Sequence, residues 1–203
     1  MTQPIEFETQ RLRLRQWLPK DRELFAALNA DPRVMAFFPT ALDRAASDAM
    51  ADRLQALITE RGWGFWAAEI KETGQFIGFV GLHIPMAELP FSPCVEIGWR
   101  LAFQYWGMGL ATEAAMAALS VGFEKLDLPE IISFTSVRNL RARAVMQRLG
   151  MFETPETFEH PLVPVGNPLR PHYLYRLSRE QWAARRVQLD HDITAILIMT
   201  LIA

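Results

Sequence analysis

The sequence contains little cysteine, no excess of basic residues and no apolar run long enough to cross a bilayer. The single thiol, Cys94, cannot form an internal disulfide, which favours a reducing compartment. A formal net charge of -2 provides no broad basic surface of the kind that binds nucleic acid through its phosphates. The first residues have neither the basic nor the apolar segment of a secretory signal. We therefore expect a cytoplasmic protein that binds neither nucleic acid nor membranes.

The chain also lacks internal repeats and low-complexity linkers that would divide it. At 203 residues it is long enough for one well-buried domain. Its last stretch, residues 193–203, is apolar but shorter than the roughly 20 residues that span a membrane. We interpret this stretch as an added strand, as a self-association segment that would support a homodimer, or as a tail without function.

Half of the residues are apolar and 22% are charged, which is typical of a soluble globular enzyme. Alternating apolar residues predict strands, and apolar residues three to four positions apart predict helices. Strands are expected at 8–17, 63–70, 75–84, 94–103, 131–136, 151–158 and 172–177, and helices at 19–30, 43–61, 110–125, 139–149 and 178–189. This order predicts an α/β (mixed α+β) fold, with a mixed sheet of about seven strands packed between helices.

A glycine turn joins the predicted strand 94–103 directly to the alanine-rich helix 110–125. It reads Gln104-Tyr-Trp-Gly107-Met-Gly109. The start of a helix presents unpaired N–H groups and a positive dipole end, and glycines let the backbone approach a diphosphate closely. The chain has no Gly-Lys-Ser/Thr for a Walker loop and no complete dinucleotide fingerprint. The turn is therefore interpreted as a diphosphate cradle of another kind.

This turn resembles the acetyl-CoA motif of the GCN5-related N-acetyltransferases (GNAT), Gln/Arg-x-x-Gly-x-Gly/Ala. The flanking Val95 to Leu101 and Ala111 to Ala114 are similar to the branch related to ribosomal-protein N-terminal acetyltransferases. So are Asn139 to Met151, the opening Glu8 to Arg15 and the closing Leu174 to Leu177. The likeness covers residues 8–182, which we assign to the acetyltransferase domain, and leaves 183–203 as a C-terminal extension of unknown role.

The resemblance implies a mostly antiparallel sheet that splays open at the CoA site, and acetyl-CoA as the acyl donor. It implies that Trp99 to Leu101 line the pantetheine arm, that the cradle holds the phosphates, and that Asn139 contacts the pantetheine or the adjacent tail. The residues that it assigns to the cosubstrate are Trp99, Arg100, Leu101, Gln104, Tyr105, Trp106, Gly107, Met108, Gly109, Leu110, Ala111 and Asn139.

Direct attack of an amine on a thioester needs a proton acceptor for the amine, and no acyl-enzyme. We assign the general base to Glu96, a carboxylate on the predicted cofactor strand; the alternative for Glu96 is an ion pair with Arg100 on the same face. Glu113 is interpreted as a first-turn acid that complements the helix dipole. Cys94 has no histidine partner in the sequence and is interpreted as a core residue.

The general acid is not assigned. Family members often place a tyrosine or a serine in the second cofactor helix, where this chain has Met146 and Ala142. The alternatives for delivering the proton to the thiolate are Ser136, Tyr173, Tyr175 and water. In a further alternative the thiolate leaves without an acid, and backbone N–H groups stabilise its charge.

The four histidines do not follow a metal-ligand spacing, and we expect no metal. His83 is interpreted as a hydrogen-bonded core residue, whereas His160 and His172 flank a proline-rich loop and are candidates to meet the acceptor. Phe37-Phe38-Pro39 and Phe91 are expected in loops that border the acceptor site, which favours an acceptor with an apolar part.

Three functions fit these patterns. The first is an N-acetyltransferase acting on a protein N-terminus or a small primary amine. The second is a non-catalytic acyl-CoA-binding or sensor module, suggested by the missing acid. The third, a structural or interaction role, depends only on the apolar tail.

Overall fold

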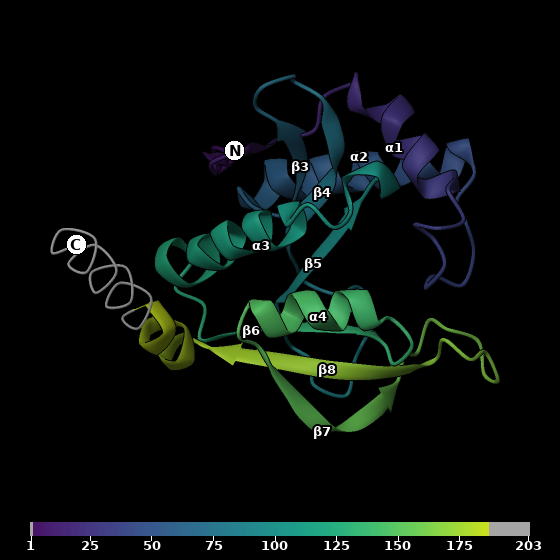
Figure 1. The fold of residues 1–203 in the computed structure, drawn as a ribbon, viewed down its shortest axis with the longest axis vertical. Helices are drawn as coiled ribbons and strands as arrows, with labels where there is room; N and C mark the ends of the chain where they lie inside the picture. The colour runs from purple at the N-terminus through teal and green to yellow at the C-terminus, as the bar shows by residue number, and fades with distance from the viewer. Residues whose placement is uncertain (1, 187–203) are drawn as a thin grey trace, which may run out of the picture.

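The computed structural model describes residues 2–186. Within this range the chain forms one eight-stranded sheet flanked by helices (Figure 1). The strand order is β1-β2-β3-β4-β5-β6-β8-β7, one strand more than the sequence predicted. The strands are β1 Phe7–Glu8, β2 Leu12–Arg15, β3 Phe65–Ile70, β4 Phe76–His83, β5 Glu96–Leu101, β6 Glu130–Ser136, β7 Phe152–Glu159 and β8 Pro171–Ser178.

The helices are α1 Asp21–Ala30, α2 Arg44–Arg61, α3 Leu110–Ser120 and α4 Leu140–Arg148, and residues 179–186 are also helical. Helix α2 shows why the sequence predicted its ends closely. The side chain of Asp43 accepts a hydrogen bond from the N–H of Ala46 at 2.8 Å, which caps the start. Gly62 ends the helix in the left-handed conformation, with φ of 85°, as glycine does without strain.

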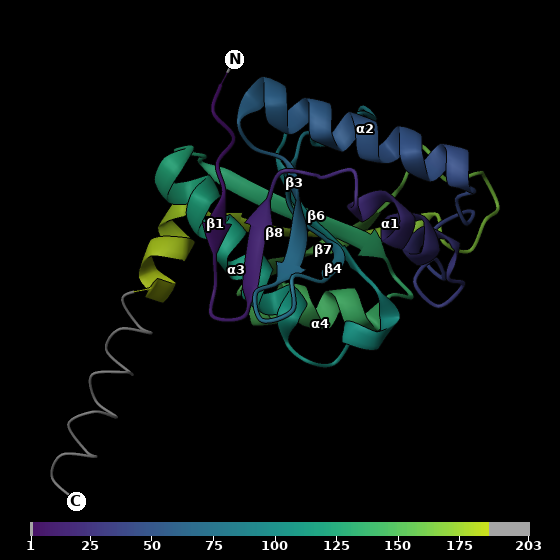
Figure 2. The same ribbon diagram turned by 90° about the horizontal axis from the view of Figure 1, so that it is seen from above.

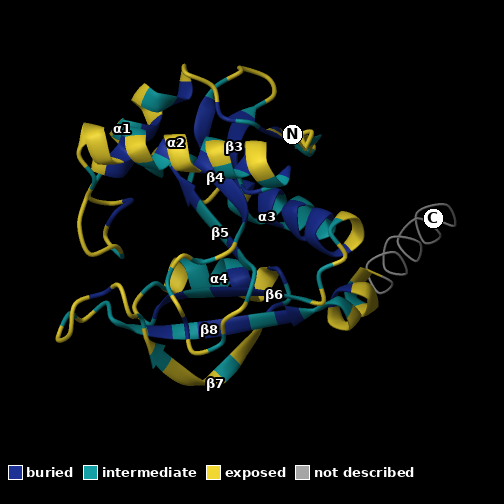
Figure 3. Ribbon diagram, turned by 180° about the vertical axis from the view of Figure 1, so that it is seen from behind, coloured by how far each residue is buried: buried dark blue, intermediate teal, exposed yellow. Residues whose placement is uncertain are grey.

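The helices cover both faces of the sheet. Helices α1 and α2 pack on one face, against β4 and β3, while α3 and α4 pack on the other, against β4, β5 and β6. Figure 2, seen from above, shows α2 and α4 on opposite sides of the strands. We call these the α1 face and the α3 face. Strand β4 is buried on both faces (Figure 3), as its unbroken apolar sequence predicted.

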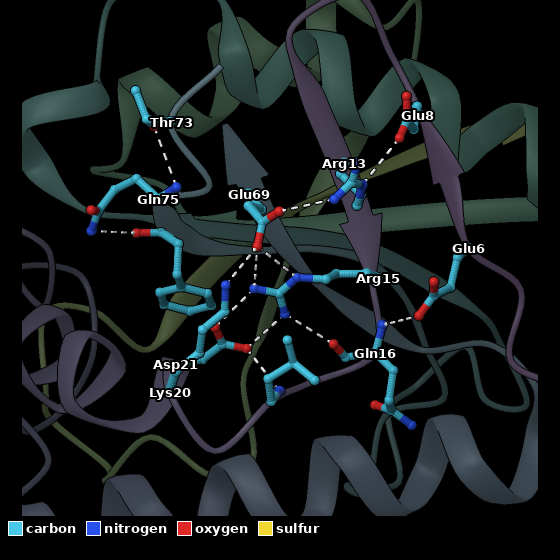
Figure 4. A network of polar contacts seen from close by, with 12 residues as sticks. Glu6, Glu8, Arg13, Arg15, Gln16, Lys20, Asp21, Glu69, Thr73 and Gln75 are labelled. Atoms are coloured by element: carbon cyan, nitrogen blue, oxygen red, sulfur yellow. Dashed lines mark hydrogen bonds and ion pairs between the residues drawn. The ribbon is translucent and has the colours of Figure 1, made fainter. Parts of the chain in front are cut away.

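A buried ion cluster fixes the start of α1 to the sheet (Figure 4). The guanidinium of Arg15 donates to Asp21 at 2.7 and 2.9 Å and to Glu69 at 2.8 and 2.9 Å. All three side chains are buried, so each charge depends on its partners for the stabilisation that water would otherwise provide.

Strands β5 and β6 form the parallel pair of the sheet, and they separate soon after they meet. One register pair joins them, Glu96 with Ile132. The N–H of Ile132 donates to the carbonyl of Val95 at 2.9 Å, and the hydroxyl of Ser133 donates to the carbonyl of Ile97 at 2.8 Å. Beyond these contacts β5 and β6 diverge, as the predicted splay requires. We call this opening the β5–β6 gap.

Three sequence-based boundaries were wrong. The predicted strand 8–17 is a hairpin, because residues 9–11 turn between β1 and β2 and Thr9 N–H bonds to the carbonyl of Leu12 at 2.8 Å. The predicted helix 110–125 is α3 followed by the π-helical turn Val121–Lys125. Ser178 belongs to β8 rather than to the last helix.

The end of that helix and the apolar stretch 193–203 lie outside the described residues. Within residues 2–186, none of the helices combines the length and apolar character needed to cross a bilayer.

Candidate active site at the glycine turn and the β5–β6 gap

The predicted cradle lies between β5 and α3, after a short 3-10 turn at Phe103–Tyr105. Gly107 and Gly109 both have φ of 77°, a left-handed conformation that strains other residues. The first helical bond of α3 runs from the N–H of Glu113 to the carbonyl of Gly109 at 3.0 Å. Between Gly107 and Thr112, no main-chain N–H donates to another residue of the range 2–186. The turn therefore presents a row of free donors at the positive end of α3.

The remaining cradle residues divide between support and surface. Gln104 and Met108 are exposed, whereas Tyr105 and Trp106 are half-buried against the core. Leu110 is buried and anchors the first turn of α3, and Ala111 beside it is half-buried.

A contact that the sequence analysis missed holds the cradle in place. Glu113 accepts hydrogen bonds from the hydroxyl of Thr9 at 2.6 Å and from the main chain and side chain of Arg11 at 2.9 and 2.6 Å. Arg11 also donates to the carbonyl of Met108 at 2.9 Å. Burial acts to raise the pKa of Glu113, but these bonds hold it below its usual value. Glu113 thus ties the β1–β2 turn to the cradle, in addition to lying in the first turn of α3.

The main chain of β5 faces two directions. Ala102 N–H donates to the carbonyl of Ile77 on β4 at 2.9 Å, and main-chain groups alternate sides along a strand. The backbone groups of Trp99 and Leu101 therefore point to the β5–β6 gap, while those of Arg100 point to β4. The indole N–H of Trp106 already donates to the carbonyl of Leu101 at 2.8 Å.

The side chain of Arg100 also lies away from the gap. It extends across the α1 face and donates to Asn29 of α1 at 2.7 Å. No ion pair joins Arg100 to Glu96 in the described structure, so the alternative role considered for Glu96 is wrong. Of the three β5 residues assigned to the pantetheine arm, Arg100 is the one whose main chain and side chain both point away from the gap.

Asn139 caps α4. Its side-chain oxygen accepts from the N–H of Ala142 at 3.2 Å, and its amide donates to the hydroxyl of Thr135 at 3.0 Å. Because β5 and β6 are parallel, the turns that follow them lie at the same edge of the sheet. Asn139 therefore starts α4 at the edge where the cradle starts α3, and its contact with a cosubstrate stays a prediction.

Glu96 lies where the β5–β6 gap begins, with its side chain on the α1 face. The carboxyl is partly accessible and has no hydrogen bond or ion pair with any residue between 2 and 186. Burial raises its pKa from the usual 4.5 to about 8, since the protein offers no charge or donor to stabilise the carboxylate. A carboxyl with a pKa near 8 exchanges protons readily near neutral pH.

His83 lies directly opposite Glu96 in the β4–β5 register. Its ring stacks on Phe65, with 5.0 Å between ring centroids. Burial, with a smaller effect from the charge of Arg61, lowers the pKa of His83 to about 4, so the ring is neutral. The imidazole ring of His83 has no hydrogen bond within the described range, and the expectation of a core histidine with a hydrogen-bonded side chain was wrong.

The candidate acids differ in whether their hydroxyls are free. Tyr175 lies on the α3 face, where its hydroxyl donates to Glu153 and accepts from Arg143 at 3.2 Å. Burial and the bond to Glu153 raise the pKa of Tyr175. A raised pKa makes the phenol a weaker acid, which disfavours Tyr175 as the proton donor. Tyr173 lies under Arg143, 4.3 Å from guanidinium carbon to ring centroid. Ser136, by contrast, is buried with no partner for its hydroxyl in the described residues.

Aromatic rings and two histidines form a second group on the α1 face, over β6, β8 and β7. His160 and His172 lie 4.8 Å apart between ring centroids, and burial lowers the pKa of each, that of His160 to about 4. The group consists of Phe91, Phe134, Phe158, His160 and His172. The predicted loop residue Phe91 is thus part of a largely apolar wall on the face that carries Glu96.

Two surface hollows lie elsewhere. One of about 560 Å³ follows α2 near Thr2 and Gln55. Another of about 420 Å³ lies between α3 and residues 179–186, beside Glu113 and Trp182. Neither includes Glu96 or the cradle glycines, so backbone geometry, not surface depth, locates the site.

Comparison with known families agrees with this geometry. Residues 11–152 match the family model described as the acetyltransferase (GNAT) domain. The chain belongs to the GNAT acetyltransferase family. As a GNAT acetyltransferase it is an N-acetyltransferase that takes an acetyl group from acetyl-CoA. The match covers the cradle, the β5–β6 gap and α4.

Individual GNAT relatives extend the match over most of the chain. The uncharacterized protein YkkB of Bacillus subtilis is 31% identical over 154 residues, which cover 74% of this chain and 87% of YkkB. The FsC-acetyl coenzyme A-N(2)-transacetylase of Aspergillus fumigatus is 29% identical, over 86% of this chain and 76% of that protein. A GNAT-family acetyltransferase from Bacillus anthracis shares the fold, with a TM-score of 0.72 and 23% identity, over 87% of this chain and 99% of that one.

The putative ribosomal N-acetyltransferase YdaF of Bacillus subtilis is 34% identical over 58 residues, or 29% of this chain, which agrees with the resemblance to the ribosomal branch of the GNAT family. Membership of an enzyme family disfavours the non-catalytic acyl-CoA-binding module. The limits 8–182 for the whole domain stay a prediction, because the family model ends at 152.

Proposed function

We propose that this GNAT protein transfers acetyl from acetyl-CoA to a primary amine by direct attack, with Glu96 as the general base. The observation that carries the proposal is the position of Glu96. It combines a carboxyl without internal partners, a pKa raised to about 8 and a place at the closed end of the β5–β6 gap.

The two ends of the gap have different parts in this proposal. The free N–H groups from Gly107 to Thr112 hold the diphosphate of acetyl-CoA, because they are unpaired donors at a helix start. The backbone of Trp99 and Leu101 lines the path from there toward Glu96. The thioester then lies near Glu96, where an amine that enters over the α1 face meets it.

The proposed reaction needs one proton acceptor before the leaving group departs. The neutral amine attacks the thioester carbonyl, Glu96 accepts the amine proton, and the tetrahedral intermediate collapses to the amide and the CoA thiolate. Among the candidate acids, Ser136 has a buried hydroxyl without a hydrogen-bond partner in the described residues. Proton transfer from Ser136 to the thiolate is an alternative to proton transfer from water.

An acyl-enzyme is not needed. Cys94 is half-buried, and burial raises the pKa of its thiol, which disfavours the thiolate that attacks esters. Incubation with acetyl-CoA and no amine should leave the mass of the protein unchanged.

The test is thiol release from acetyl-CoA across a panel of amines and short peptides, together with acetyl-CoA binding by calorimetry. Binding with amine-dependent release is the expected result. A chain that binds acetyl-CoA but releases no thiol with any acceptor contradicts the proposed reaction, and a covalent acetyl group on Cys94 contradicts direct attack.

A further inference from the structure

The α1 face carries a second charged group besides Glu96, the guanidinium of Arg100. Both side chains project from β5 on the same face, four residues apart, with Gly98 between them. Four residues of strand span about 13 Å. Gly98 adds no side chain to this interval, and the ring of Phe65 from β3 lies over it, because a Cβ at Gly98 would stand 3.1 Å from two carbons of that ring. The half-buried Phe65 ring therefore forms the floor between the two groups.

Arg100 is buried without a counter-ion. Its exposed fraction is 9%, and it forms no ion pair with a carboxylate of residues 2–186. One nitrogen donates to Asn29 at 2.7 Å, while Nε is buried with no partner. Burial lowers the pKa of Arg100 to about 10, which still leaves the group charged at neutral pH.

Arg15 shows how this chain treats a buried arginine that serves the fold. It is as buried as Arg100, yet Asp21 and Glu69 both bind its guanidinium. A buried charge without such partners is costly. The contrast with Arg15 indicates that the missing partner of Arg100 is an anionic group supplied by a ligand.

The surroundings of Arg100 hold its guanidinium in one position. Asn29 of α1, which accepts from Arg100, donates in turn to the hydroxyl of Ser47 of α2 at 2.9 Å. The rings of Phe79 and Phe38 lie 5.4 and 4.1 Å from the guanidinium carbon. Phe38 belongs to the connection between α1 and α2 and is 38% exposed. The partly exposed ring of Phe38 therefore covers one side of the Arg100 guanidinium, which the hydrogen bond to Asn29 holds in place.

We propose that Arg100 binds a carboxylate of the amine acceptor, so that the enzyme prefers acceptors that carry an amine and an anionic group on the order of 10 Å apart. Glu96 receives the amine end and Arg100 the anionic end, across the ring of Phe65 that covers Gly98. This inference rests on the proposed function, and it narrows the acceptor to long-chain amino acids, or to peptides and similar amines whose carboxylate lies on the order of 10 Å from the amine. Phe38 is the wall that closes over the anionic end.

Matched acceptors test the preference. With 8-aminooctanoate and octylamine, the wild type should show a kcat/KM at least tenfold higher for the amino acid, as a charge-assisted hydrogen bond supplies. In Arg100→Met this ratio should fall to about one, and Arg100→Lys should keep part of it. Arg44→Met, at an exposed ion pair on α2, is the matched control and should keep the ratio.

A second measurement needs no variant. Octanoate should compete with the amine acceptor, whereas its neutral analogue octanamide should not. Equal kcat/KM for the two wild-type acceptors, an unchanged ratio in Arg100→Met, or equal inhibition by octanoate and octanamide overturns the proposal. Failure of the proposed function looks different, because then neither acceptor releases thiol from acetyl-CoA.

Discussion

Replacing Glu96 by glutamine removes a costly buried charge while keeping the size of the side chain. Burial raises the pKa of this carboxyl from 4.5 to about 8, so the folded protein holds a proton that the unfolded chain releases between these pH values. The free energy of unfolding therefore falls as the pH rises from about 4.5 to 8, and the loss is complete above 8. Glutamine does not titrate, and the variant lacks this loss.

The size of the effect follows from the pKa shift. Above both pKa values, the shift from 4.5 to about 8 corresponds to about 5 kcal/mol. For a chain of this length that raises the melting temperature by about 10–20 °C.

Thermal denaturation of both proteins from pH 5 to pH 9, at constant ionic strength, measures this effect. Near pH 5 the melting temperatures should nearly coincide, and at pH 8.5 the variant should melt higher. Glu72→Gln, in the exposed turn between β3 and β4, controls for the loss of one negative charge. A variant that melts below the wild type at pH 8.5, or a difference that is the same at both pH values, refutes the reasoning.

Three further outcomes follow from contacts around the site. Gly107→Val should abolish acetyl-CoA binding in calorimetry, because valine is strained at the φ of 77° that the cradle requires. The far-UV spectrum should stay native, because no atom lies within 4 Å of the added Cβ; intact binding contradicts the cradle. Arg11→Ala should weaken acetyl-CoA binding about tenfold, or ~1.4 kcal/mol, by freeing the charge of Glu113, and adding Glu113→Gln should restore part of it; no recovery in the double variant refutes the repulsion. Asp21→Ala should cost about 3–5 kcal/mol of folding stability, since it leaves Arg15 short of a partner; a free energy of unfolding within about 0.5 kcal/mol of the wild type excludes that role for the ion cluster.

The sequence predicted the parts of the fold that depend on local signals. Asp43 and Gly62 marked the ends of α2, Lys71 to Gly74 marked the β3–β4 turn, and Gly107 and Gly109 marked the cradle. The hairpin at residues 9–11 was missed because its turn contains no glycine or proline and the alternating pattern continues through it.

Contacts between distant residues were beyond the reach of the sequence. Arg11 and Glu113 are 102 positions apart, and nothing in either segment indicates the other. Arg100 was grouped with the gap because it lies between Trp99 and Leu101, although alternation along the strand turns its backbone to β4. The capping role of Asn139, in contrast, had a readable signal, an asparagine immediately before a helix.

The pH dependence of acetyl transfer tests the central claim, that Glu96 is the base, most directly. With one amine acceptor and saturating acetyl-CoA, kcat/KM of the wild type for the amine should rise with an apparent pKa near 8, because the carboxyl must lose its proton before it can accept one. Glu96→Gln should lower the rate about 100-fold or more and remove that pKa from the profile, with acetyl-CoA binding unchanged. A variant that keeps the wild-type rate and profile would contradict the account.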